Sequence, residues 1–168
     1  MMDFLTCVEQ TIADVYKVNS RNTLKEDKTL GRQEIRYKRS GKQLLYSFDV
    51  DERGNPSPFP FLKDYKGLKK VSDFVLFTNR QKDNKPFILI FELKKSKSPY
   101  KQLKATKSFC EFLIKRMELA FPVNFDPEIR MIGLVEGIKT GTRIDDVTYN
   151  DGIFNTPLRY IEIAKLLK

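Results

Sequence analysis

Three charged residues stand at the ends of two apolar segments that follow each other along the chain. Asp73 lies early in the segment VSDFVLF, and Glu92 and Lys94 close the segment PFILIFELK. Carboxylate oxygens are the ligands that hard divalent cations prefer. These residue types therefore suit a metal site, provided that the fold brings the two carboxylates together.

The polar segment TNRQKDNK joins the two apolar segments. A short polar connection between two β-rich segments predicts a β-hairpin. If the turn is centred near Lys82 and Asp83, Asp73 lies directly opposite Glu92, and directly opposed residues point to the same face. Lys94 follows Glu92 by two positions, so the strand period predicts that it shares this face.

The second segment is apolar at consecutive positions from Ile88 to Phe91, which predicts a central strand covered on both faces. Ionised carboxylates in such a place carry a desolvation cost, and two opposed carboxylates also repel each other. A divalent cation between them would reverse both penalties. The alternative is that the strand ends at Phe91 and that Glu92 and Lys94 are solvated in a charged tail.

Composition bounds the class of protein. The chain has 168 residues, of which 40% are hydrophobic and 13 are Phe, and this predicts one globular domain spanning 1–168. We find neither an apolar run long enough to cross a bilayer nor a signal peptide, so we expect a cytoplasmic protein without a membrane partner. Cys7 and Cys110 are expected to be reduced core thiols.

The balance of charge favours polyanionic partners. The chain carries 31 Lys and Arg against 22 Asp and Glu, a net charge of +9, which suits nucleic acid but is not specific for it. Histidine is absent, and this excludes histidine-based acid–base chemistry and the typical zinc sites that contain histidine. Carboxylates, lysines and a metal are therefore the expected means of any catalysis.

The elements that must position these residues follow from periodicity. Apolar residues at helical spacing predict an opening helix over Asp3–Val18, with Asp3 as its N-cap, and a long helix from Pro99 to about Leu119. We expect strands at Gln33–Arg39, Gln43–Val50, Arg130–Val135 and Arg159–Ile163, and a final tail or helical turn. Polar loops are expected at 20–30, 51–67 and 139–151, the second held to the body by Phe59 and Phe61.

A tight turn at SGK is expected to join the first two of these strands. Helices and strands interleave, so the expected class is α/β with a mixed central β-sheet flanked by helices.

Within the long helix, Gln102 falls on the inward stripe, in line with Thr106. Glu9 sits at the edge of the apolar stripe of the opening helix, where a solvated carboxylate is the simplest interpretation.

This arrangement resembles the PD-(D/E)xK nuclease superfamily. The resemblance rests on Asp73, then Glu92, Leu93 and Lys94 at a strand end, then a helix with Gln102 near its start. Gln102 with Thr106 is similar to the QxxxY motif of RecB-like members, with Thr in place of Tyr. Ser72 stands where the motif's name has proline. The resemblance implies the restriction-endonuclease-like fold, in which an initial helix, a strand meander, a helix and a further strand form the core.

The resemblance also implies roles for particular residues. Asp73, Glu92 and the backbone carbonyl of Leu93 would hold Mg²⁺ or Mn²⁺, and Glu9 resembles an additional acid that many members place near the metal. Lys94 would orient the attacking water or stabilise developing charge, and Gln102 would hydrogen-bond the water, the metal shell or a phosphate. Phosphate contacts would come from Lys95, Lys97 and Lys101. For each of these lysines, an ordinary role as a solubilising surface residue is an equally good interpretation.

The implied function is metal-dependent hydrolysis of phosphodiester bonds in DNA, in a repair, recombination or defence setting. Two alternatives stay open: a catalytically inactive nucleic-acid-binding or protein-interaction domain on the same fold, and a basic α/β adaptor without a site. The short chain favours nonspecific or structure-guided recognition, and a homodimer is one assembly that would suit it.

Overall fold

The computed structural model describes residues 2–20, 22–28, 31–50, 54–94, 99–135, 147, 149–157 and 160–168. Their secondary structure, in chain order, is α1 (Phe4–Thr11), the 3-10 helix η1 (Asp14–Tyr16), β1 (Thr23–Lys28), β2 (Gly31–Lys38), β3 (Gln43–Tyr46), β4 (Phe74–Asn79), β5 (Pro86–Lys94), α3 (Tyr100–Ala120), β6 (Glu128–Val135), β7 (Ile153–Pro157), β8 (Tyr160–Glu162) and α4 (Ile163–Leu166). The expected α/β class is therefore correct at the level of its elements.

The strands form two mixed sheets, where a single mixed sheet was expected. The larger sheet has the order β3-β4-β5-β6-β7, and the smaller has the order β1-β2-β8. β3, β4 and β5 run antiparallel as a meander, whereas β6 and β7 run parallel to β5. The expected turn at SGK joins strands of different sheets, because β2 pairs with β1 and β8 while β3 pairs with β4.

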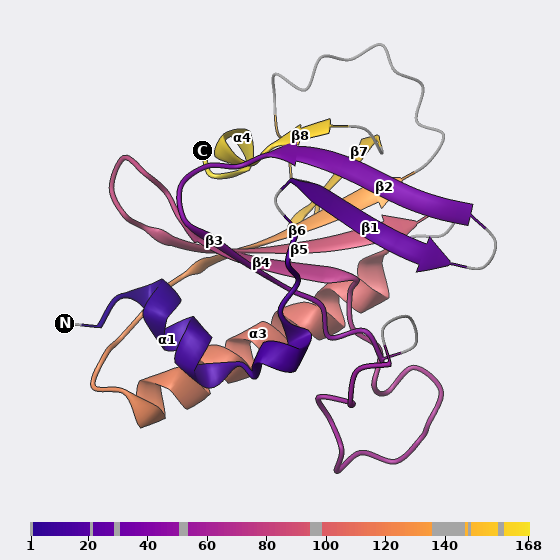
Figure 1. The fold of residues 1–168 in the computed structure, drawn as a ribbon, viewed down its shortest axis with the longest axis horizontal. Coiled ribbons are helices and arrows are strands. Elements are labelled where there is room, and N and C mark those ends of the chain that lie inside the picture. Colours follow the sequence, from indigo (N-terminus) through magenta and orange to yellow (C-terminus); the bar gives the residue numbers. More distant parts are fainter. Residues whose placement is uncertain are drawn as a thin grey trace.

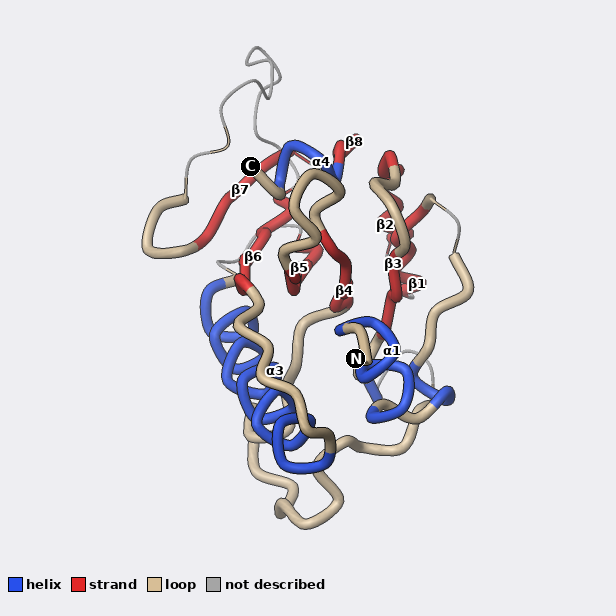
Figure 2. Tube along the Cα trace, turned by 90° about the vertical axis from the view of Figure 1, so that its left-hand side faces the viewer, coloured by secondary structure: helices blue, strands red, loops and turns tan. Residues whose placement is uncertain are grey.

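The two faces of the larger sheet are covered by different layers. Figure 1 shows α1 and α3 on one side of this sheet, and β1, β2, β8 and α4 on the other. Figure 2 shows α1 beside α3, and α4 and β8 at the opposite end of the molecule. Alternate residues of β5 supply the two core clusters: Ile88 and Ile90 pack with α1 and α3, and Leu89 and Phe91 pack with the smaller sheet. The prediction of a central strand covered on both faces is confirmed.

The long helix follows its predicted pattern. α3 buries Leu103, Thr106, Phe109, Cys110 and Met117 along one stripe. The loop before β4 contributes Phe59, whose ring meets that of Phe109 edge-on with 5.0 Å between centroids. Phe61, expected to do the same, is 78% exposed. One ring therefore holds this loop to the body.

Three segments differ from the sequence-based expectations. Asp3 caps α1 as predicted, accepting from the Thr6 N–H at 3.0 Å, but the helix ends at Thr11 because Ile12 and Ala13 are extended. β1 was expected to be loop because its sequence is polar and lacks an apolar alternation. Of its described side chains, only that of Leu24 is buried. β7 lies between the expected loop and the expected last strand, where no element was predicted.

Two further predictions concern properties of the whole chain. Cys7 and Cys110 are buried thiols outside any disulfide, as expected. No helix in the described part of the chain is long and apolar enough to span a membrane.

Of the expected polar loop at 139–151, residues 139–146 and 148 lie outside the described residues.

Candidate functional site

The β4–β5 hairpin sets Asp73 against Glu92. Its register pairs Asn79 with Pro86 and Phe74 with Phe91, so the next pair toward the open end is Asp73 with Glu92. Each carboxylate accepts a hydrogen bond from a backbone N–H of the facing strand. The Asp73 N–H donates to Glu92 Oε2 at 3.2 Å, and the N–H of Leu93 donates to Asp73 Oδ2 at 2.6 Å. The predicted cross-strand pairing is confirmed.

Both carboxylates lie inside the protein. Asp73 is 4% exposed and Glu92 is 0% exposed. β5 continues past Glu92 to Lys94, which pairs with Val135 of β6. The alternative in which the strand ends at Phe91 and Glu92 is solvated is therefore wrong, and the adaptor interpretation that depended on it loses its basis. Lys94 ends β5, and its side chain lies outside the described part of the structure.

The N-terminus of α3 begins beside this pair. Glu92 pairs with Gly133 of β6, and a Cβ on Gly133 would lie only 2.7 Å from Cγ of Pro99, the residue that precedes α3. The first turn of the helix is thus packed closely on the sheet next to Glu92. The positive end of the helix dipole favours negative charge in its neighbourhood, which suits both a carboxylate and a phosphate.

A hydroxyl on α3 fixes the residue that precedes Asp73. Thr106 Oγ1 accepts the Ser72 N–H at 2.6 Å, lies 3.1 Å from Ser72 Oγ, and donates to the Gln102 carbonyl at 2.9 Å. Thr106 and Ser72 are both 0% exposed. The sequence placed Thr106 on the inward stripe but did not reveal this role. A small polar residue on that stripe, facing the approach to Asp73, is the signal that could have found it.

The lysines and the glutamine expected at the site have different outcomes. Gln102 is half-buried in the first turn of α3, and Lys101 beside it is exposed. The backbone carbonyl of Gln102 accepts the hydrogen bond from the Thr106 hydroxyl. The expected role of the Gln102 side-chain amide stays a prediction. Lys95 and Lys97 lie outside the described residues.

Glu9 does not join the pair as a third acid. Its carboxylate lies 2.9 Å from Lys17 Nζ and 3.6 Å from Lys42 Nζ, and its side chain is 37% exposed. The hydrogen bond from Lys17 holds the pKa of the Glu9 carboxyl below its usual value. Among the residues that the structure describes, no three acidic, cysteine or histidine side chains are grouped to hold a metal. The metal role expected of Glu9 is corrected to a surface ion pair, because α1 carries it toward Lys17 and Lys42.

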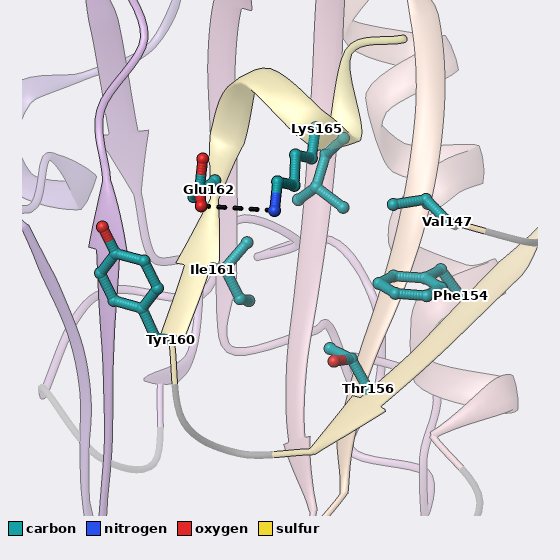
Figure 3. Close-up of a pocket in the computed structure, with 8 residues that line it drawn as sticks. Val147, Phe154, Thr156, Tyr160, Ile161, Glu162 and Lys165 are labelled. Atoms are coloured by element: carbon teal, nitrogen blue, oxygen red, sulfur yellow. Dashed lines mark ion pairs between the residues drawn. The ribbon is translucent and has the colours of Figure 1, made fainter. Parts of the chain in front are cut away.

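A hollow lies between β7, β8 and α4, on the face of the larger sheet away from α3 (Figure 3). Its volume is about 180 Å³, and its walls include Phe154, Ile161 and the buried Thr156. The carboxylate of Glu162 at this hollow pairs with Lys165 at 3.4 Å. The hollow thus differs from the Asp73–Glu92 site, where two carboxylates face each other.

Comparison of the chain with protein-family models, with curated proteins and with solved structures finds no match. Two opposed carboxylates, buried on neighbouring strands beside the start of α3, provide the oxygen ligands that a hard divalent cation prefers.

Proposed function

We propose that this protein is a metal-dependent nuclease that hydrolyses phosphodiester bonds, with DNA as its substrate. The observation that carries the proposal is the buried pair of Asp73 and Glu92, held in register by hydrogen bonds from two backbone N–H groups. Like charges placed directly opposite each other destabilise a strand pair. A site that keeps them there gains from a cation that binds both.

The order of the elements supports this proposal. An opening helix (α1), an antiparallel meander (β3, β4, β5), a helix (α3) and a strand parallel to its neighbour (β6) follow each other along the chain. This is the core that the resemblance to the PD-(D/E)xK superfamily implies. We accordingly propose the restriction-endonuclease-like fold for this core, to which β1, β2, β7, β8 and α4 are added.

The donor set fits Mg²⁺ or Mn²⁺ better than a cation that needs a full protein cage. Mg²⁺ is commonly held by one or two carboxylates together with waters and substrate phosphates. Asp73 and Glu92 supply the carboxylates, and the carbonyl of Leu93 is the proposed third protein ligand. When bound, the cation lowers the pKa of a coordinated water and polarises the phosphate. The backbone N–H groups of Asp73 and Leu93 keep the two carboxylates oriented for it.

The remaining residues are assigned by their charge and place. A protonated Lys94, at the end of β5, would stabilise negative charge that develops on the phosphate. Gln102 and Lys101 in the first turn of α3 would bind the nucleic-acid backbone, with Lys95 and Lys97 as further phosphate contacts. The net charge of +9 favours association with a polyanion.

Isosteric variants give the sharpest test. Replacement of either acid by alanine would leave a buried N–H without its acceptor and so confuse lost chemistry with lost folding. Asp73→Asn and Glu92→Gln retain an acceptor oxygen and remove one ligand charge. The matched control is Glu111→Gln, an exposed acid on α3 that pairs with Lys107. Each protein is incubated with supercoiled DNA, single-stranded DNA and single-stranded RNA, in Mn²⁺, Mg²⁺ or EDTA.

We expect the wild type and Glu111→Gln to cut DNA with either cation and not in EDTA. Asp73→Asn and Glu92→Gln should be slower by at least about 100-fold, because each loses about 2.7 kcal/mol or more of charge stabilisation at the metal. Variants that cut as fast as the wild type would refute the assignment of the site. A wild type that binds DNA and cuts none of the substrates would instead indicate an inactive binding domain.

A further inference from the structure

The acidic pair lies in a row that crosses the larger sheet. Gly133 of β6 pairs with Glu92 on one side and with Asn155 of β7 on the other. Two positions earlier on these strands, Met131 and Ile153 belong to the core cluster that packs beneath α1 and α3. Because strand side chains alternate between faces, the row of Glu92, Gly133 and Asn155 lies on this same face.

Asn155 extends over the glycine in the middle of this row. A Cβ added to Gly133 would lie 2.3 Å from Oδ1 of Asn155, which is far inside van der Waals contact. The amide oxygen therefore occupies the space that a side chain at position 133 would take, so the Asn155 side chain extends from β7 over β6, the strand next to Glu92. Neighbouring strands are about 4.8 Å apart, so the amide lies about one strand spacing from the row position of Glu92.

The chemistry of this amide suits a nucleic-acid backbone. Asn155 is exposed, so its amide is accessible to a ligand. Its NH₂ group offers two donors, and asparagine is among the side chains that contact phosphate oxygens. An uncharged donor also adds no repulsion toward the phosphates, whereas a third carboxylate in the row would.

We propose that Asn155 is a substrate-binding residue whose amide donates to a backbone phosphate oxygen beside the scissile bond. The role rests on the proposed nuclease function, since it assumes a nucleic-acid strand at Asp73 and Glu92. The strand then crosses the sheet from β5 toward β7, over Gly133. Glycine at position 133 is required because any Cβ would displace the amide from this path.

A purely structural explanation of Gly133 is available, and the experiment must exclude it. Pro99 also lies close to the same space, so the glycine could serve only to admit the start of α3. The test therefore changes Asn155 and leaves Gly133 intact. Asn155→Ala removes the amide, and Asn155→Asp keeps its shape while adding a negative charge. Asn124→Ala, at an exposed asparagine beyond the other end of α3, is the matched control.

Binding is measured by fluorescence anisotropy with a labelled single-stranded DNA and a labelled duplex, in Ca²⁺, which oxygen ligands also bind. We expect Asn155→Ala to raise the Kd for DNA about tenfold, as for the loss of one hydrogen bond to a charged group. Asn155→Asp should raise it further, and Asn124→Ala should leave it unchanged. The affinity for Mn²⁺ alone, from calorimetric titration, should stay at the wild-type value in both Asn155 variants.

Two results would overturn the proposal: DNA affinity that is unchanged in both Asn155 variants, or Mn²⁺ affinity that falls together with DNA affinity. The readout also separates this proposal from the nuclease function. A wild type that binds DNA through Asn155 and cuts nothing refutes the nuclease function and supports the binding role. A wild type that cuts DNA, with both Asn155 variants retaining its Kd and KM, refutes the binding role alone.

Discussion

The hydroxyl of Thr106 offers a sharp test of how the acidic pair is held. Thr106→Val replaces the side chain by one of nearly the same shape without the hydroxyl. The Ser72 N–H then loses the acceptor that it has at 2.6 Å, and both residues are 0% exposed. A buried donor left without a partner costs about 1–3 kcal/mol. For a domain of this size, a loss of about 2 kcal/mol lowers Tm by about 4–8 °C.

Thr106→Ser is the matched control because it keeps the hydroxyl and removes a methyl group. Burying one methyl contributes about 0.8 kcal/mol, so we expect a cost near 1 kcal/mol once a small cavity is included. Hydrogen bonding therefore predicts that Val is the more damaging substitution. Hydrophobic burial alone predicts the opposite order, since valine is the more apolar residue.

The assay is urea denaturation followed by circular dichroism, comparing the midpoints of the three proteins at constant m. The expected order of stability is wild type, then Thr106→Ser, then Thr106→Val. A Thr106→Val protein as stable as the wild type, or more stable than Thr106→Ser, would refute the role of this hydroxyl. In the nuclease proposed above, Thr106→Val should also slow DNA cleavage, because Ser72 directly precedes Asp73.

Three further predictions concern the acidic pair, Gly133 and the Arg80–Asp83 ion pair. Mn²⁺ at 100 times its Kd should stabilise the wild type by about 2.7 kcal/mol in a thermal melt but leave Glu92→Gln unshifted; an equal rise in both would place the cation elsewhere. Gly133→Ala should cost about 1–3 kcal/mol in urea denaturation, because its Cβ meets Asn155 and Pro99. Adding Asn155→Ala should recover part of that cost, and strictly additive losses would contradict this contact. The hydrogen-bonded ion pair with Arg80 lowers the pKa of Asp83 to about 2. The ion pair stabilises the folded protein fully above the unfolded-state pKa of Asp83, near 3.9, and this stabilisation is lost as the pH falls toward 2. The free energy of unfolding of the wild type should therefore fall more steeply than that of Asp83→Asn from about pH 5 to pH 3. Parallel pH curves would count against this ion pair.

The hairpin register was predictable because it depends on local sequence alone. A short polar turn near Lys82 and Asp83 fixes which residues oppose each other, and the pairing of Phe74 with Phe91 follows from it. The α3 stripe was predictable for the same reason, since helical spacing is read within one segment. β1 was not, because its charged side chains give no apolar alternation and its pairing with β2 supplies what its composition does not.

The site was predictable only where its residues are close in sequence or lie on one hairpin. Asp73 and Glu92 belong to that class. The contact of Thr106 with Ser72 depends on how α3 packs on the sheet, and the row through Gly133 to Asn155 depends on two parallel pairings. No periodicity in the sequence encodes those registers. Glu9 was misassigned because its helical position fixes a face but not which neighbour faces it, and that neighbour is a pair of lysines.

The single-turnover rate of DNA cleavage as a function of Mn²⁺ concentration tests whether Asp73 and Glu92 form a metal-dependent nuclease site. Protein is held in excess over end-labelled DNA, and wild type is compared with Glu92→Gln. We predict that the wild-type rate rises from zero in EDTA to a plateau, and that Glu92→Gln stays at least about 100-fold below it at every concentration. Equal rates for the two proteins, or a wild-type rate that does not depend on Mn²⁺, would contradict a metal-dependent nuclease site at Asp73 and Glu92.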